Sequence, residues 1–178
     1  MERLDKNSWL SEGFKILDAE GFSRITIDNL CERQKRSKGS FYYHFKNIDG
    51  YIEELMKYWV QEYTITPLKT AEIKKTPALI YKALTNMVFK SPYKVERVIR
   101  AWGYSNFVVK EYVQKVDKIR IDYMVGLKKE AGSDEKTAYH SAILQFAILI
   151  GIQQLYPDMP EKELAEVYKM YTTNSQHF

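Results

Sequence analysis

The chain has 178 residues, of which 45% are hydrophobic and 28% are charged, and its formal net charge is +4. This balance is typical of a folded globular protein and excludes an intrinsically disordered chain. The single cysteine, Cys31, excludes an intrachain disulfide and a zinc site built from several thiolates. Because His44, His140 and His177 show no ligand spacing, we expect no metal and no cofactor.

The sequence also lacks the signals of export and of membrane insertion. The segment from Met1 to Asn7 is mostly polar and charged, unlike a signal peptide. The longest apolar run, from Ala142 to Ile152, is interrupted by Gln145 and is too short to span a bilayer. We therefore expect a cytoplasmic protein that does not contact a membrane.

Hydrophobic residues recur at helical spacing along nine segments, and no segment shows the alternation that is typical of a strand. Glycine and proline are few, 8 and 5, which favours long helices over many short elements. The sequence therefore predicts an all-α protein of about nine helices. In chain order, these cover residues 8–20, 27–34, 38–44, 50–65, 77–89, 92–103, 107–130, 134–155 and 161–173.

Capping residues mark the ends of several predicted helices. Gly21 ends the first, because glycine tolerates the left-handed backbone that follows many helices. Thr26 and Ser37 begin the next two, since their hydroxyls can accept from amide groups left unpaired at a helix start. Asp49 is expected to cap the fourth, and Thr66-Pro67 to end it. Further start signals are predicted at Thr76, Ser91, Asn106 and Asp134.

Positive charge is concentrated in one short segment. Between Arg33 and Lys46 there are five basic residues and no acidic one, whereas residues 51–178 carry 18 Lys and Arg against 15 Asp and Glu. Such a cluster alone favours a solvated helix face. Its position favours a function, because the cluster lies around the start of the second helix of a closely spaced pair.

A helix-turn-helix places its second helix in the major groove of DNA, with its N-terminal residues leading. This arrangement needs cations and hydroxyls near the phosphates, small residues where the backbone approaches DNA, and apolar residues on the opposite face. The segment from Ser37 to Phe45 meets all three requirements. Lys38 supplies a cation, Gly39 permits close approach, and Phe41 and Phe45 are expected to face the core.

Residues 9–55 resemble the DNA-binding domain of the TetR family of transcription regulators. The resemblance rests on Gly21-Phe22, Thr26-Ile27, Leu30 and Glu32-Arg33, followed by the uninterrupted run from Ser37 to Asn47. It covers about a quarter of the chain, and the remaining helices agree with the family in number and order. It implies that the protein binds double-stranded DNA and regulates transcription.

The resemblance also implies a role for each matching residue. Those at positions that usually meet the sugar–phosphate backbone are Thr26, Ser40, Tyr42, His44 and Lys46. Those at positions that face base edges are Lys38, Gly39 and Tyr43, with Tyr42 as a further candidate. Lys38 could donate to guanine O6 or N7, and the helix start at Ser37 suits a phosphate. The alternative for both tyrosines is half-buried packing, and for His44 it is a structural hydrogen bond.

The turn between the two helices departs from the family pattern, which is usually Ala-Gly-Val with a left-handed glycine and a buried valine. Here the turn reads Gln34-Lys35-Arg36. A left-handed lysine costs about 1 kcal/mol, and an arginine at a normally buried position has to reach outward. We expect Arg36 to add a DNA contact, so that Arg36→Ala would weaken binding and reduce its salt dependence. The geometry of the turn stays open.

The resemblance divides the chain into a DNA-binding domain over residues 1–48 and a helical ligand-binding and dimerisation domain over residues 49–178. The predicted helix from Asp134 to Leu155 is apolar on nearly every side and therefore needs cover on every side. A second subunit would supply part of this cover; the alternative is a fully buried core helix. Family dimers pair their last two long helices, which implies a palindromic operator. The predicted interface residues are Ile143, Phe146, Ile150, Leu164, Val167, Tyr168 and Tyr171.

Aromatic residues are frequent in the middle helices, where regulators of this kind hold a small apolar or amphipathic inducer. Such an inducer would relieve repression by moving the helix over residues 50–65, which links the head to the body. For each candidate the alternative is ordinary core packing. The residues expected to line the pocket are Tyr81, Asn86, Trp102, Phe107, Tyr123 and Gln145, with Asn86 and Gln145 as polar anchors.

Two interpretations of the body stay open. One is a ligand-responsive dimeric repressor, and the other is a DNA-binding dimer whose C-terminal domain binds a protein partner and no inducer. An apolar internal cavity would favour the first, and an exposed apolar patch on a filled body the second. We do not expect an enzyme, because the sequence shows no nucleophile–base pair, phosphate loop or metal-ligand spacing. Operator, effector and regulated genes are not predicted.

Overall fold

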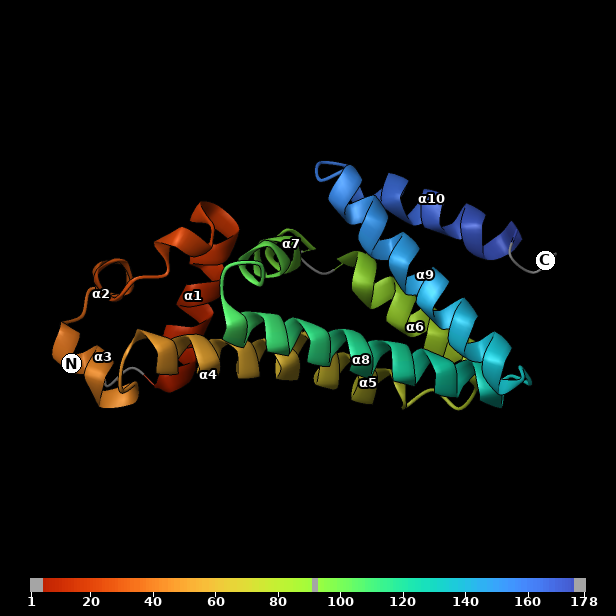
Figure 1. Cartoon of the computed structure of the whole chain (residues 1–178), viewed down its shortest axis with the longest axis horizontal. Coiled ribbons are helices and arrows are strands. Elements are labelled where there is room, and N and C mark those ends of the chain that lie inside the picture. Colours follow the sequence, from red (N-terminus) through yellow and green to blue (C-terminus); the bar gives the residue numbers. More distant parts are fainter. Residues whose placement is uncertain (1–4, 91–92, 175–178) are drawn as a thin grey trace. The chain divides into compact units, whose positions relative to one another are not determined.

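The computed structural model describes residues 5–90 and 93–174, without the side chains of 171–174, and every element in these ranges is a helix (Figure 1). Within them, α4 (Ile48–Val60) continues through one π-helical turn, η2 (Gln61–Ile65), into α5 (Thr66–Ala71). The ten α-helices of the described residues therefore form nine continuous rods. This confirms the all-α class and the helix number predicted from the sequence.

The helices belong to two compact units. Unit 1 takes the chain up to Tyr63 together with residues 94–115, and unit 2 takes Thr64 to Tyr93 together with the chain from Val116 onward. Unit 1 extends past the domain boundary predicted at residue 48, because α4 packs on the first helix of the chain. The division at residue 48 stays a prediction about function and is not a division of packing.

Unit 1 is built from the N-terminal helices and from the start of the middle ones. Its elements are α1 (Lys6–Glu20), the short 3₁₀ turn η1 (Phe22–Arg24), α2 (Ile27–Gln34), α3 (Lys38–His44), α4, most of α7 (Tyr93–Trp102) and the first part of α8 (Phe107–Glu130). Unit 2 contains α5, α6 (Pro77–Lys90), the second part of α8, α9 (Glu135–Leu155) and α10 (Glu161–Asn174).

Several predicted helix starts are confirmed by their capping hydrogen bonds. The Thr26 hydroxyl accepts from the Asn29 amide at 3.2 Å, and the Asp134 carboxylate accepts from the Thr137 amide at 3.1 Å. The predicted cap at Asp49 is wrong: Asn47 caps α4, since its side-chain oxygen lies 2.8 Å from the Gly50 amide. Caps are also formed by Ser37, Thr76 and Asn106, whereas Ser91 lies outside the described residues.

The helix predicted to stop at Thr66-Pro67 continues instead into α5. Pro67 lies in the first turn of α5, directly after η2. A residue in the first turn of a helix does not need an amide hydrogen for the helical ladder, and a π turn shifts that ladder locally. The proline is therefore accommodated without ending the rod.

Unit 2 has two apolar clusters among its described residues. One joins α5, α6 and α8 through Ala71, Ile80 and Leu127. The other joins α6 and α10 through Phe89, Leu164 and Tyr168. None of the described helices combines the length and the apolar character that a bilayer crossing requires.

Candidate DNA interface

The inner face of α3 is held by aromatic packing. Phe41 is fully buried, and its ring centroid lies 5.7 Å from that of Trp9 on α1 and 5.7 Å from that of Tyr51 on α4. Phe45 adds a ring contact to Phe41 at 5.2 Å. Aromatic pairs at these separations stabilise by more than the area that they bury. The predicted inward orientation of Phe41 and Phe45 is therefore confirmed, and α3 has one fixed orientation in unit 1.

Tyr51 ties α4 to α1 through a buried hydrogen bond. Its hydroxyl donates to the Trp9 carbonyl oxygen at 2.9 Å, and burial raises the pKa of Tyr51, which keeps the hydroxyl protonated. The hydroxyl passes close to Gly13, where a Cβ atom would lie only 2.1 Å from it. Tyr51 was not among the residues predicted to be buried, although its i,i+4 spacing from the buried Leu55 indicates an inward position.

The opposite face of α3 is open to solvent. The exposed fractions are 53% for Tyr42 and 63% for Tyr43, and the Tyr42 ring also packs edge-on against Phe41 at 5.7 Å. Half-buried packing therefore describes Tyr42 in the free protein, whereas Tyr43 lies mostly in solvent. Lys38 and Gly39 are also exposed, whereas His44 is partly buried with its ring against Tyr43 at 4.9 Å. Among the other predicted DNA contacts, Thr26, Ser37 and Lys46 are exposed and Ser40 is partly buried. The exposed face of α3 thus presents a cation, a glycine and phenol groups.

The turn between α2 and α3, whose geometry the sequence left open, is left-handed at Lys35. Lys35 has φ 52° and ψ 47°, and it is the one non-glycine residue with positive φ in the described part of the chain. The Arg36 amide donates to the Cys31 carbonyl at 2.9 Å and the Lys35 amide to the Glu32 carbonyl at 3.0 Å. These two bonds form the helix-ending motif that usually contains glycine. Arg36 itself is partly buried, and its contact with DNA stays a prediction.

Arg33 pairs with acidic residues of α1, although about a third of its side chain, 32%, stays exposed. Its guanidinium donates to Glu12 on α1 at 2.6 Å and to Glu20 at 2.7 Å. Burial alone would raise the pKa of Glu12, but hydrogen bonds from Arg33 and Lys15 outweigh it and hold the pKa below its ordinary value. Arg33 therefore fastens α2 to α1.

Asp28 is a neighbour of the candidate interface that the sequence analysis did not identify. Its carboxylate lies 2.6 Å from the ammonium group of Lys38, and both side chains are largely exposed. The hydrogen bond to Asp28 raises the pKa of Lys38. Because the two residues start different helices, no spacing rule in the sequence joins them. Lys38 is therefore oriented by α2 before any ligand arrives.

The residues predicted to line an inducer pocket are divided between the two units. Gln145 on α9 donates from its amide nitrogen to the Tyr81 hydroxyl on α6, and Tyr123 packs on the cluster around Ile80. Asn86, also in unit 2, is exposed. Trp102 and Phe107 belong to unit 1, where Trp102 stacks on Phe22 at 5.8 Å and Phe107 is exposed. In the described residues, no three His, Cys, Asp or Glu side chains form a metal-binding cluster.

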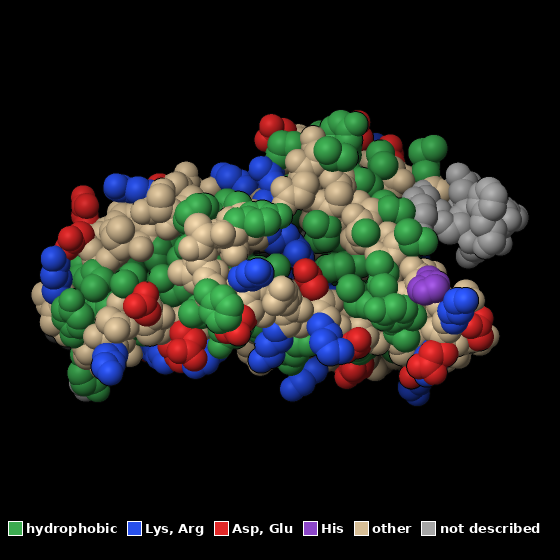
Figure 2. Space-filling model, viewed as in Figure 1, with side chains coloured by type: hydrophobic (Ala, Val, Ile, Leu, Met, Phe, Trp, Pro, Cys, Tyr) green, Lys and Arg blue, Asp and Glu red, His purple; other side chains and the backbone are tan. Residues whose placement is uncertain are grey.

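Along α9 the usual pattern of burial is reversed. The small residues Ala138 and Ala142 are buried, whereas Leu144 is 57% exposed and Ile143 is also exposed. Figure 2 shows hydrophobic side chains gathered on this part of unit 2. A large apolar side chain in water is normal when isolated, but a row of them along a helix indicates a missing partner.

The other predicted interface residues have different environments. Val167 on α10 is exposed, and Phe146 and Ile150 are partly buried. Leu164 and Tyr168 are buried against Phe89 in their own subunit, so the prediction that they face a second subunit is wrong. α10 turns this part of its stripe inward because α6 offers an apolar surface. The side chain of Tyr171 lies outside the described residues.

The sequence matches no known protein-family model and no curated protein sequence. Solved structures do resemble the fold. A TetR transcriptional regulator from Legionella pneumophila superposes with a TM-score of 0.77 over 96% of this chain and 99% of its own, at 11% identity. A putative transcriptional regulator from Pseudomonas aeruginosa PAO1 superposes with a TM-score of 0.75 over 98% of this chain and 93% of its own, at 14% identity. The chain therefore shares the fold of a TetR transcriptional regulator.

Proposed function

We propose that the chain is a DNA-binding regulator of transcription that places α3 in the major groove. The observation that carries this proposal is the division of α3 into two faces, with Phe41 fully buried and Lys38 and Tyr43 in solvent. A recognition helix needs this combination of a fixed orientation and an open polar face. The shared fold with two structures described as transcriptional regulators supports the proposal.

The local hydrogen bonds are compatible with phosphate contacts beside α3. Thr26 and Ser37 use hydroxyl lone pairs to accept from backbone amides at the starts of α2 and α3. Each hydroxyl therefore keeps its own hydrogen, which it can donate to a phosphate oxygen. In the proposed complex these groups set the register of the head, while Lys38, Gly39 and Tyr43 face base edges.

Selection from a pool of random duplexes tests the proposal. We expect the protein to enrich an inverted repeat whose half-sites are about one helical turn apart. The double variant Lys38→Ala/Tyr43→Ala should lose this enrichment. The matched control Lys82→Ala/Tyr104→Ala removes the same two residue types from exposed positions on α6 and on the turn before α8. Equal enrichment by both double variants would contradict the proposal.

The protein is proposed to act as a homodimer through α9 and α10. The support is the exposed apolar face that includes Tyr139, Leu144, Val167 and Met170, which a second copy would cover. In sedimentation equilibrium at micromolar concentration, the wild type should be a dimer and Leu144→Lys a monomer. Leu79→Lys is the matched control, because Leu79 is about as exposed as Leu144 and lies on α6. A monomeric wild type would contradict dimerisation.

Response to a small-molecule effector, with relief of repression, is the remaining part of the proposal. The buried polar pair of Gln145 and Tyr81 supports it, because Gln145 is 7% exposed and its amide oxygen has no hydrogen-bond partner in the described part of the chain. A buried acceptor without a donor costs about 1–3 kcal/mol. A bound molecule that donates to this oxygen would recover that cost and would stabilise the ligand-bound form of unit 2.

A further inference from the structure

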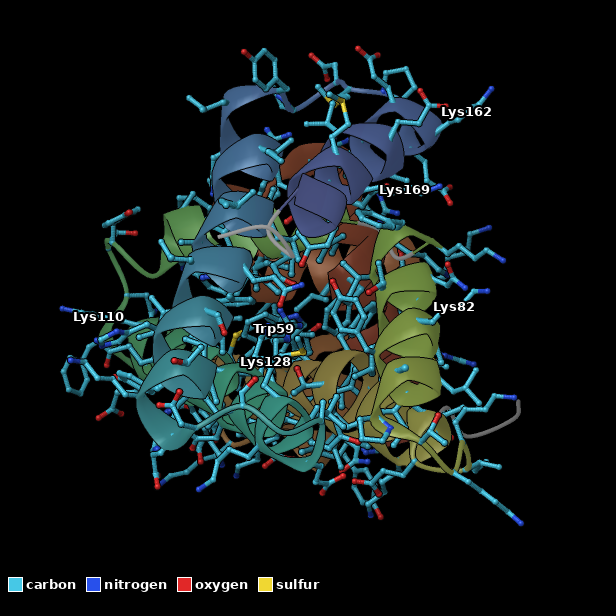
Figure 3. The ribbon with its side chains drawn as sticks, turned by 90° about the vertical axis from the view of Figure 1, so that its right-hand side faces the viewer. Trp59, Lys82, Lys110, Lys128, Lys162 and Lys169 are labelled. Carbon is cyan, nitrogen blue, oxygen red and sulfur yellow. The ribbon has the colours of Figure 1, made fainter. Side chains whose placement is uncertain are left out.

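Lys128 is a partly buried lysine of unit 2. It lies in the last turn of α8, next to Leu127 of the cluster that joins α5, α6 and α8. Figure 3 shows Lys128 inside the ring of helices formed by α6, α8 and α9, whereas Lys82 and Lys162 point outward. Lysine usually keeps its ammonium group in water even when its aliphatic chain is covered. The inward position of Lys128 is therefore unusual for a lysine.

The ammonium group of Lys128 has no counter-ion among the described residues. Neighbouring lysines of the same helix are paired: Lys118 with Asp122 at 2.7 Å and Lys129 with Glu135 at 3.2 Å. For Lys128, burial lowers the pKa, and no nearby carboxylate opposes this effect. A partly desolvated cation without an anion is costly and attracts one.

A second unsatisfied polar group lies in the same unit. Gln145 donates to the Tyr81 hydroxyl, while its Oε1 is buried without a donor in the described residues. Tyr81 follows Ile80 in α6, and Lys128 follows Leu127 in α8; Ile80 and Leu127 belong to one apolar cluster, on which Tyr123 packs. Among its described residues, unit 2 therefore holds a partly buried cation without a counter-ion and a buried amide oxygen without a donor. The cation is on α8 and the partner of the amide, Tyr81, is on α6, and one apolar cluster joins these two helices.

We propose that the effector is a monocarboxylate with an apolar body, whose carboxylate pairs with Lys128 and whose hydroxyl or amide hydrogen reaches Gln145 Oε1. This inference rests on the proposed effector response and specifies its chemistry. The carboxylate compensates the desolvated ammonium, and the donor satisfies the glutamine. The apolar body packs against the side chains around Ile80, including Tyr123 and Met124. A neutral or cationic amphiphile fits less well because it leaves Lys128 uncompensated.

Matched amphiphiles test the charge requirement. The probes are ω-hydroxydecanoate, decanediol and aminodecanol, with their hexyl counterparts as shorter bodies, titrated into the full chain by calorimetry. We expect the hydroxy acid to bind about tenfold to a hundredfold more tightly than the diol, which is the range for a hydrogen bond to a charged group. The amino alcohol should bind most weakly. Equal affinities for the three, or no binding by either hydroxy acid, would overturn the proposal.

Substitution of the two polar groups tests their roles. Lys128→Met should reduce hydroxy-acid affinity to that of the diol and leave diol affinity within about twofold, because it removes only the charge. Gln145→Leu should reduce affinity for ω-hydroxydecanoate but not for decanoate. Lys82→Met, on the outer side of α6, is the matched control and should change neither. A Lys128→Met protein that still prefers the hydroxy acid would overturn the assignment.

Two further measurements separate this inference from failures of folding and of the proposed function. Loss of an uncompensated charge should raise the thermal midpoint of Lys128→Met, so a misfolded variant would itself contradict the burial argument. The hydroxy acid should also release wild-type protein from the selected duplex. If the duplex binds and the hydroxy acid does not, the effector assignment fails and DNA binding stands. If the hydroxy acid binds but no duplex is enriched, the proposed regulator fails and the site stands.

Discussion

A single methyl group on Gly39 should separate folding from DNA binding. A Cβ atom built at Gly39 has Ser37 Oγ, at 3.6 Å, as its nearest neighbour, so the free protein has room for alanine. Glycine inside a helix is less stable than alanine by about 0.5–1 kcal/mol. Gly39→Ala should therefore match or exceed wild-type stability in urea denaturation. In the proposed complex the same methyl group meets DNA and should lower duplex affinity at least about tenfold, or 1.4 kcal/mol.

Gly13→Ala is the matched control in the same unit. There the added Cβ would lie 2.1 Å from the Tyr51 hydroxyl and 3.0 Å from Leu55 Cδ1, both inside the core. Overpacking of this kind costs about 1–3 kcal/mol. The control should lose stability but keep duplex affinity under conditions where it is folded. Fluorescence anisotropy with the selected duplex measures binding, and a Gly39→Ala protein with wild-type affinity would refute the proposed approach of the α3 backbone to DNA.

Three further outcomes are expected. Lys35→Gly should be more stable than Lys35→Ala by about 0.5–1 kcal/mol in urea, because glycine adopts the left-handed backbone without strain; equal stability would contradict that account. The pKa of Glu12 is held below its ordinary value of 4.5, so the stability that ionised Glu12 adds is present above pH 4.5 and is lost as the pH falls through the pKa of the folded protein. Glu12→Gln cannot ionise opposite Arg33, so its free energy of unfolding should fall less steeply with decreasing pH than that of the wild type. Asp28→Asn should release Lys38 and increase non-specific duplex affinity about two- to fivefold at low salt, with the gain shrinking as salt is added.

Local signals in the sequence were sufficient for most of the secondary structure and for the polar face of α3. Capping hydroxyls and helical spacing depend only on residues within one or two turns. The helix starts at Thr26 and Ser37 and the inward position of Phe41 were therefore predictable from the sequence. The backbone at Lys35 stayed open in the sequence, because a left-handed residue at a helix end is usually a glycine and a lysine gives no such signal. The wrong stop at Pro67 came from a general rule that a preceding π turn overrides.

Tertiary packing decided the features that depend on residues distant in the chain. The pairs Asp28–Lys38, Tyr51–Trp9 and Gln145–Tyr81 join different helices, and no periodicity within one helix specifies which helices meet. The same reason explains why the inward position of Leu164 could not be predicted. The apolar stripe of α10 could pack on its own subunit or on a second one, and the pattern does not distinguish the two. The sequence alone therefore determined the helices and the exposed face of α3. Only the folded chain revealed a partly buried lysine that has no counter-ion among the described residues.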